Sequence, residues 1–546
     1  MRRSRLFGAL VSCALLLGVV AAVGAPPAGA AASGTLRIGA QEELYCADWI
    51  ASCAGLSWGS WTLGVETLPQ AFQVTSQGDY VPGPVLAGEP VLEVGPPMRV
   101  TYAIAPAAVW SDGVPITSAD FAYTWKQIVD GRDIYDETGY NQISAIDTTD
   151  PARAVVTFSA PFAGWKDLFG GFSYILPSHL LEGKDRHREM KDGYAFSGGP
   201  WMLEGGKAGW KKGRSITLVP NPRWWGQPAS IAKVIFQFIP DSAAEVQALK
   251  SHQVLAAYPQ PQTGILDQMK QAGLTTIVGF GNAYEGLWLN ESVAPLDDPA
   301  VRQALVYATD RKAIVDQIVT PSVGEGRVLQ SFIVPTFPSL YVPAFAQYTT
   351  SQAKVDATMT GAGWARGRDG IWTKGGRRAE LEAVTTAGNK NRELNLQIWQ
   401  SQLQAAGFDL TPKFVAADVL FGKLLPQGRY TISLYTSVGT PDPGLCVLFC
   451  SANIPNKQND YVGQNFTRTN SPAVDRVWGA VDRELDPTVR TALVHEGQQV
   501  LADEVVSIPL FQQPDLFVYD GSRISGPLED NPVMGPFWNL ELWKLR

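Results

Sequence analysis

The chain has 546 residues, of which 45% are hydrophobic and 18% charged, so it can bury at least one large core and is neither disordered nor fibrous. Lysine and arginine number 44 against 52 aspartate and glutamate, a formal net charge of -8 at pH 7. Three of the cations, Arg2, Arg3 and Arg5, stand at the N-terminus, so the rest of the chain is more acidic still. This balance argues against nucleic acid as a partner.

The first 30 residues have the order of a secretory signal peptide. Basic residues come first, an uncharged run covers residues 6–25, and the small-residue box Ala28-Gly29-Ala30 follows. We therefore expect cleavage near Ala30 and an extracytoplasmic protein, located in a periplasm-like space, at the cell surface or in the medium. The alternative is an uncleaved anchor, since the run approaches the ~20 residues that span a bilayer. A lipid-modified Cys13 is disfavoured because the apolar run continues beyond it.

The mature chain retains four cysteines in two close pairs. An exported chain meets an oxidising compartment, so we expect the disulfides Cys46–Cys53 and Cys446–Cys450. Each would close a small loop and stiffen a local turn. A four-cysteine zinc site is the alternative, but the spacings differ from the usual two-residue knuckles.

Strand-like and helix-like segments alternate along the rest of the chain. Alternating apolar residues predict strands at 100–104, 156–158 and 216–218. A capping box at 117–120 predicts a helix with Phe121 and Trp125 on its apolar face, and Asp298-Pro299 starts another. A third helix is expected through 489–500. With no fixed repeat, the pattern predicts an α/β architecture in more than one lobe, connected by short hinge segments.

The segment WSDGVPITSADFAYTWK, residues 110–126, resembles a signature of the family 5 extracellular solute-binding proteins, the oligopeptide and dipeptide receptors of ATP-binding cassette importers. Further segments resemble that family in the same order along the chain. They are residues 199–203, 219–226, 238–253, 287–290, 295–305 with 310–311, 363–364 with 369–372, 441–443 and 508–510. Trp110, Asp112, Arg302 and Asp310 in these segments are interpreted as structural residues.

The resemblance implies a bilobal α/β fold like that of the periplasmic binding proteins (type II, with an extra subdomain), with discontinuous lobes joined by a hinge. Lobe I would comprise residues 31–68, an inserted subdomain at 69–197, residues 198–286 and residues 505–546. Lobe II would be residues 287–504. Ligand would bind between the lobes, and closure would create the form that a membrane permease recognises.

One feature departs from the peptide receptors that the chain resembles. In those proteins an aspartate three residues before an acidic-Pro step pairs with the ammonium group of the ligand, whereas here Gly439 holds that place before Asp442-Pro443. A buried ammonium without a counter-ion is costly. Either another acid, such as Asp442 or Glu43, takes the role, or the ligand lacks a free N-terminus.

The expected ligand-binding residues combine aromatic rings with the end of a predicted strand. The set is Trp58, Trp61, Tyr284, Tyr435, Thr436, Ser437, Val438, Gly439 and Asp442. The alternative for each ring is a place in the core. The Cys446–Cys450 loop follows Asp442, so it either shapes one wall of the pocket or stiffens an exposed turn.

Enzyme signatures in the chain are incomplete. Gly55–Gly59 matches the nucleophile elbow of serine hydrolases around Ser57, but it comes too early for the strands that precede such an elbow. Ser351–Lys354 and Ser451–Asn453 imitate two boxes of penicillin-interacting enzymes, whose third box is missing. The four histidines have no metal-binding spacing. We expect no catalysis, no cofactor and no metal site.

The sequence therefore predicts a monomeric receptor that captures a peptide or peptide-like solute and delivers it to an ATP-binding cassette permease. The alternatives are a receptor for a non-peptide solute, such as a glycoconjugate, an oligosaccharide or a metal chelate, and an exported serine hydrolase that uses Ser57.

Overall fold

The computed structural model describes residues 32–54, 57–531 and 533–546. The predicted signal peptide, residues 1–30, lies outside this range. None of the described helices combines the length and the apolar character that a membrane span requires.

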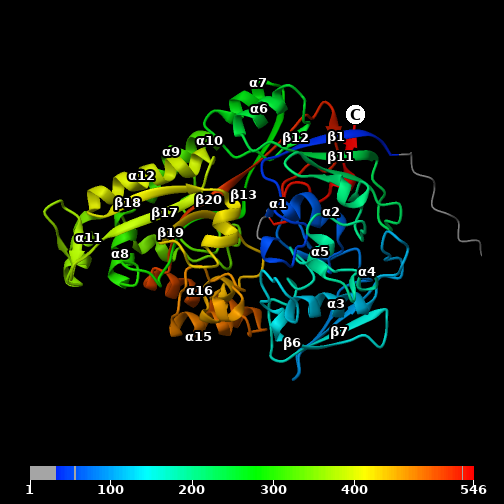
Figure 1. The fold of residues 1–546 in the computed structure, drawn as a ribbon, viewed down its shortest axis with the longest axis horizontal. Coiled ribbons are helices and arrows are strands. Elements are labelled where there is room, and N and C mark those ends of the chain that lie inside the picture. The colour runs from blue at the N-terminus through cyan, green and yellow to red at the C-terminus, as the bar shows by residue number, and fades with distance from the viewer. Residues whose placement is uncertain (1–31, 55–56, 532) are drawn as a thin grey trace, which may run out of the picture. The chain divides into compact units, whose positions relative to one another are not determined.

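An eleven-stranded mixed sheet runs through the fold (Figure 1). Its strand order is β18 (Asp409–Val415), β17 (Glu380–Thr386), β19 (Ile432–Val438), β13 (Thr275–Leu289), β20 (Ser507–Tyr519), β12 (Ala256–Ala257), β1 (Ser33–Ala40), β11 (Ile231–Phe238), β10 (Ser215–Pro220) and β8 (Trp201–Leu203), with β9 (Trp210–Lys211) beside β10. Strand β1 pairs parallel with β11, and β17 pairs parallel with β18, whereas β13 is antiparallel to both of its neighbours, β19 and β20.

The two longest strands, β13 and β20, pair antiparallel along nearly their whole length but are interrupted in the middle. The register is regular from Thr275 to Phe280 and resumes at Tyr284, with a bulge between them. The carbonyl of Gly281, inside the bulge, accepts a hydrogen bond from Gln512 Nε2 at 2.7 Å, and that of Phe280 accepts one from Thr336 Oγ1 at 2.9 Å. Side chains therefore satisfy these two carbonyls at the bulge.

A four-stranded antiparallel sheet forms a separate layer under α3 (Ser118–Val129). Its strands are β4 (Val91–Glu93), β5 (Arg99–Ala103), β7 (Arg153–Phe158) and β6 (Ile143–Asp147), in that order. The predicted capping box is confirmed, since Thr117 and Asp120 exchange side-chain and backbone hydrogen bonds at the start of α3. Phe121 is fully buried against Tyr102 of β5.

The remaining elements are short in the N-terminal half and longer in the C-terminal half. The N-terminal half contains α1 (Ser57–Gly59), the π-helical turn η2 (Ser60–Gly64), α2 (Val65–Thr67), α4 (Ser178–Leu181), α5 (Arg186–Met190), α6 (Ser242–Lys250) and α7 (Ile265–Gln271), with the hairpin β2 (Phe72–Val74) and β3 (Tyr80–Pro82). The C-terminal half contains α8 (Pro299–Ala308), α9 (Arg311–Ile318), α10 (Thr320–Val323), α11 (Gln352–Gly361), α12 (Lys390–Ala406), α13 (Ala417–Val419), the π-helical turn η6 (Leu420–Leu424), α14 (Cys446–Phe449), α15 (Pro472–Val481) and α16 (Pro487–Glu504), with the strands β14 (Ala365–Arg366), β15 (Trp372–Lys374) and β16 (Arg377–Arg378). A last pair, β21 (Ile524–Ser525) and β22 (Lys544–Leu545), lies near the C-terminus.

The buried apolar side chains form two large clusters. The first core contains residues between 36 and 256 together with residues between 517 and 543. The second core contains residues between 284 and 511. A smaller cluster lies around α6 and α7. Strand β20 contributes Phe511 to the second core and Phe517 to the first, so the chain passes from one core to the other within a continuous strand. The domain boundaries proposed from the sequence stay a prediction.

The signature residues interpreted as structural hold turns and helix ends. Trp110 is fully buried and its indole N–H donates to Asp120. The Asp112 carboxylate accepts from Val114 N within its turn, and Asp310 caps α9. Arg302 is buried and donates to three backbone carbonyls near the ends of neighbouring segments.

We predict that Asp298→Ala destabilises the protein by about 2 kcal/mol. Asp298 caps α8, and its second oxygen accepts hydrogen bonds from the buried indole of Trp364 and from Lys374, both at 2.9 Å. Losing the cap and leaving the indole N–H unpaired each costs about 1 kcal/mol or more. Urea unfolding gives the loss, and the neighbouring Asp297→Ala is the control, because Asp297 makes only an exposed pair with Arg377 and should change stability by less than about 0.5 kcal/mol. Equal losses in the two variants would contradict this account.

Candidate functional site

A cavity of about 540 Å³ lies between the first and second cores. Its walls combine residues of the N-terminal segment, the four-stranded sheet region, the bulge of β13 and the end of β19. All nine residues expected from the sequence line it: Trp58, Trp61, Tyr284, Tyr435, Thr436, Ser437, Val438, Gly439 and Asp442. The structure therefore brings this set together, and the contact of each residue with a ligand stays a prediction.

The end of β19 presents a free strand edge to the cavity. On one side, residues 435–438 pair with β13. On the other side, β17 pairs with β19 only at Ile432 and Ser433, and no described strand continues that pairing. Ser437 and Val438 are partly exposed at this edge. The backbone groups of this segment can therefore receive an extended chain.

Aromatic rings support this strand from behind. Tyr435 stacks on Trp288 with centroids 4.9 Å apart, and the Trp288 indole N–H donates to the Tyr435 carbonyl at 3.1 Å. Tyr435 and Tyr284 are largely buried, with 8% and 2% of their surface exposed. Both tyrosines thus belong to the second core as well as to the cavity wall.

A hydrogen-bonded ion pair lies beside the strand edge. Arg392 of α12 contacts Glu285 with Nε 2.9 Å from Oε1, and its other nitrogens donate to Thr386 and Thr436. Glu42, a half-buried residue of the cavity wall, has its pKa raised by desolvation, and the positive charge of Arg392 partly opposes that shift. Arg392 is the one cationic side chain among the described cavity-lining residues.

A second aromatic group comes from the N-terminal segment. Trp58 and Trp61 meet edge to face at 5.5 Å, and Trp61 meets Tyr258 in the same way at 5.7 Å. The Tyr258 hydroxyl donates to Asp515 of β20 at 2.5 Å. Burial raises the pKa of Asp515 and of its neighbour Asp530, so this end of the cavity holds carboxyls that resist ionisation.

Asp442, one of the acids considered for ammonium binding, already has a counter-ion in the structure. Both of its oxygens accept from Arg490, at 2.8 and 2.9 Å, in a bidentate pair that is about 85% buried. Glu43, the other alternative, accepts hydrogen bonds from Trp210 Nε1 and Gly213 N and does not line the cavity. Each carboxylate already has a structural partner.

Two further carboxyls lie close to this pair. Burial, with the Asp442 charge as the next cause, raises the pKa of Asp167 to about 7 and that of Asp482 to about 7. Sequence reasoning missed these residues and several others of the wall, because they come from segments without a recognisable motif. The missed residues that carry the polar and aromatic character of the wall are Glu42, Trp49, Asp136, Asp167, Tyr258, Arg392, Asp482 and Asp515.

The structure contains the disulfides Cys46–Cys53 and Cys446–Cys450. The second one closes the short helix α14, and the neighbouring Leu445, Val447 and Leu448 line the cavity. This loop therefore shapes one wall, as one of the two interpretations from the sequence expected.

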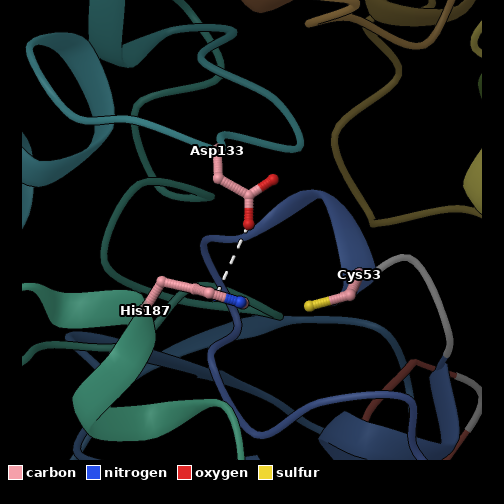
Figure 2. Close-up of side chains that lie close together, drawn as sticks. All are labelled: Cys53, Asp133 and His187. Atoms are coloured by element: carbon pink, nitrogen blue, oxygen red, sulfur yellow. Dashed lines mark ion pairs between the residues drawn. The ribbon is translucent and has the colours of Figure 1, made fainter.

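Cys53, Asp133 and His187 form a potential metal-ligand group near the first disulfide (Figure 2). Their ligand atoms lie within 4.8 Å of one another, but the sulfur of Cys53 is bonded to Cys46 and offers no thiolate. His187 Nδ1 instead lies 3.4 Å from Asp133 and 3.2 Å from Asp48, which also pairs with the buried Arg186. The group is best described as an ion-pair network.

Ser57 does not stand at a nucleophile elbow. It begins the short helix α1, and the described residues between β1 and Ser57 contain no strand that could lead into such a turn. The described residues that precede Ser57 therefore provide no strand for the sharp strand-to-helix turn that exposes a nucleophilic hydroxyl.

We predict that His187→Gln lowers stability more at pH 5.5 than at pH 8.5. The hydrogen bond to Asp48, followed by the charges of Asp48 and Asp133, raises the pKa of His187 in the folded state. A raised pKa stabilises the fold fully below the ordinary value of about 6.5, and the gain disappears as the pH rises through the folded-state pKa. Because 32% of the side chain is exposed, the effect should stay below about 1 kcal/mol.

Urea midpoints at the two pH values measure the difference. His495→Gln is the control, because its ring contacts a backbone carbonyl and has no carboxylate partner in the described part of the chain. A loss for His187→Gln that is independent of pH would exclude the ion-pair explanation.

Comparisons with known proteins agree with this geometry. Residues 84–456 match the family described as bacterial extracellular solute-binding proteins, family 5. The oligopeptide-binding protein OppA of Mycobacterium tuberculosis is 27% identical over 463 residues, which cover 82% of this chain and 75% of OppA.

Two solved structures share the fold. The periplasmic EDTA-binding protein EppA superposes with a TM-score of 0.82 at 22% identity, covering 94% of this chain and 97% of EppA. The oligopeptide-binding protein AppA of Bacillus subtilis, solved with a nonapeptide, gives a TM-score of 0.82 at 18% identity, covering 94% and 99%. The fold is thus that of the periplasmic binding proteins, and the chain belongs to family 5 of the bacterial extracellular solute-binding proteins, a family of non-catalytic substrate receptors for ABC transporters.

Proposed function

We propose that this receptor captures a peptide or peptide-like solute between its two cores and delivers it to an ATP-binding cassette permease. The observation that carries the proposal is the free edge of β19 inside the cavity. An extended peptide can add to such an edge through backbone hydrogen bonds, which bind main chain largely irrespective of side chains. The surrounding rings then provide apolar contact for the side chains.

The charge of the wall distinguishes between possible solutes. The carboxyl groups of Glu42, Asp136, Asp167, Asp442, Asp482 and Asp515 line the cavity, whereas Arg392 is the cation among the described lining residues. That cation is already paired with Glu285, so a polyanion would find no free counter-charge among the described lining residues, whatever the ionisation state of the carboxyls. The solute named for EppA, EDTA, is a polyanion, while those named for OppA and AppA are oligopeptides. The electrostatics therefore favour the peptide reading over the anionic chelate.

The receptor role also needs a moving hinge and an extracytoplasmic location. The continuous strands β13 and β20 connect the two cores, and bending at the bulge near Asn282 would open the cavity. The predicted signal peptide supports export, and the family is extracellular by definition. Hydrolysis by Ser57 is not part of the proposal.

The first test exposes the mature protein to a pool of tetra- to nonapeptides with free N-termini, to the same pool after N-acetylation, and to Fe(III)-EDTA. We expect peptides to raise the melting temperature by several degrees and to compact the protein in small-angle scattering, with no turnover. Because position 439 is a glycine and the carboxylate of Asp442 is already paired with Arg490, acetylation should reduce the shift little. A shift with the chelate and none with either pool would overturn the proposal.

We predict that Trp61→Ala weakens binding of the responding peptide at least about tenfold, equivalent to about 1.4 kcal/mol. Trp61 is partly exposed on the cavity wall and packs edge-on against Trp58 and Tyr258. Trp224→Ala is the matched control, since Trp224 packs on Trp225 away from the cavity. Calorimetric titration measures both variants, and an unchanged affinity in Trp61→Ala would remove this ring from the site.

A further inference from the structure

The two cores also contact each other through residues that line or adjoin the cavity, far along the chain from the strands that connect the cores. Gln464 Nε2 donates to Asp136 at 2.6 Å, and Ala163 N donates to the Asp482 carbonyl at 2.7 Å. Thr440 Oγ1 donates to Asp167 Oδ2 at 2.8 Å. We call the contacting segments the lips: residues 80, 135–138 and 162–167 on the first core, and residues 440–444, 453–466 and 482–490 on the second.

Asp167 is the carboxyl through which the lips are joined most directly. The Tyr80 hydroxyl donates to one of its oxygens, and Thr440 of the opposite lip donates to the other. The backbone N–H of Asp442, also of the opposite lip, donates to the Tyr80 oxygen at 3.2 Å. Hydroxyl groups can donate or accept, so this arrangement fits Asp167 in its protonated as well as its ionised form.

The charge balance at this point is unfavourable for ionised Asp167. Asp442 and Asp482 lie on the opposite lip, and Arg490 is bound by both oxygens of Asp442. Three carboxyls thus share one close arginine in a setting that excludes most water. Like charges brought together in a buried site cannot all ionise without cost.

The remaining titratable groups near Asp167 do not relieve this charge. Tyr140 contributes a neutral hydroxyl, which accepts from Phe169 N. The ammonium of Lys166, the adjacent residue, lies over the rings of Phe72 and Trp165, 5.4 and 5.6 Å from their centroids. Arg483 acts on Asp482 rather than on Asp167.

We propose that the lips form a proton-dependent latch, in which closure of the receptor takes up a proton at Asp167 and ionisation of Asp167 favours opening. The inference rests on the proposed function in one respect, because it takes from it the opening of the two cores about β13 and β20. When the lips separate, Asp167 leaves with the first core and escapes both burial and the charge of Asp442. In the closed, ligand-free receptor the three carboxyls have only one arginine beside them. A proton on Asp167 removes one of the negative charges that would otherwise remain unbalanced.

The sign of the pH dependence follows from the two states. The Asp167 carboxyl has a pKa of about 7 in the closed structure and an ordinary value of about 3.9 when exposed to solvent. The closed-to-open ratio is therefore highest below about pH 4 and falls as the pH rises between about 4 and 7. Above about pH 7 the ratio no longer depends on pH. Within the window, one carboxyl changes the closed-to-open ratio by at most about tenfold per pH unit.

The test uses the mature, ligand-free protein with fluorescent dyes on two introduced cysteines, Ser144→Cys on β6 and Lys457→Cys, both at exposed positions on opposite cores. Energy transfer reports the distance between the lips from pH 4.5 to 8. We expect the closed-to-open ratio to fall at least about tenfold as the pH rises from 5 to 7.5. The isosteric variant Asp167→Asn, which cannot ionise, should stay closed and lose most of this pH response.

Asp147→Asn is the matched control, because it removes an exposed carboxylate on β6, away from the lips. It should follow the wild type. Identical pH profiles for wild type and Asp167→Asn, a profile without pH dependence, or closure that increases with pH would each overturn the latch. The readout contains no peptide, so a receptor that fails to bind peptides but shows the expected profile contradicts the proposed function and not the latch.

Discussion

The pairing of β13 with β20 is the constraint on which the rest of the structure depends. Backbone hydrogen bonds join the two strands on both sides of the bulge. One half of this two-stranded ribbon packs in the first core and the other half packs in the second. The bulge interrupts the pairing at Asn282 and Ala283, and these residues line the cavity together with Gln513 and Pro514 of β20. The irregularity in the ribbon is therefore also part of the cavity wall.

Much of the fold could be predicted because local physics and ordered motifs agree. The capping box at Thr117 and the cap at Asp298 depend on residues within a few positions of one another, and the indole of Trp110 donates to Asp120 within the same signature segment. The family resemblance extends these local signals to the whole chain and is confirmed by the family match and by the similarity of fold. The two disulfides follow from close cysteine pairs, where alternatives in space are few.

The electrostatic part of the site could not be predicted in the same way. Arg490 lies 48 residues after Asp442, and no spacing rule connects them. Asp167 and Asp482 are separated by most of the chain, yet share the environment of that pair. The sequence identified Asp442 as a cavity residue but could not identify its counter-ion, because the groups that surround a carboxylate are known only once the chain has folded. The free edge of β19 likewise could not be predicted, because it depends on where the neighbouring strand β17 stops pairing with β19 in the folded sheet.

The positions of the two disulfides have a consequence for maturation. Cys46–Cys53 closes the loop that precedes Trp58 and Trp61, and Cys446–Cys450 closes the helical turn beside Leu445 and Leu448. Both covalent links thus border the cavity, one on each core, and both span few residues. A newly made chain in a reducing environment lacks these two disulfide bonds. The shape of two walls of the cavity is therefore set partly by covalent bonds that form only where thiols are oxidised.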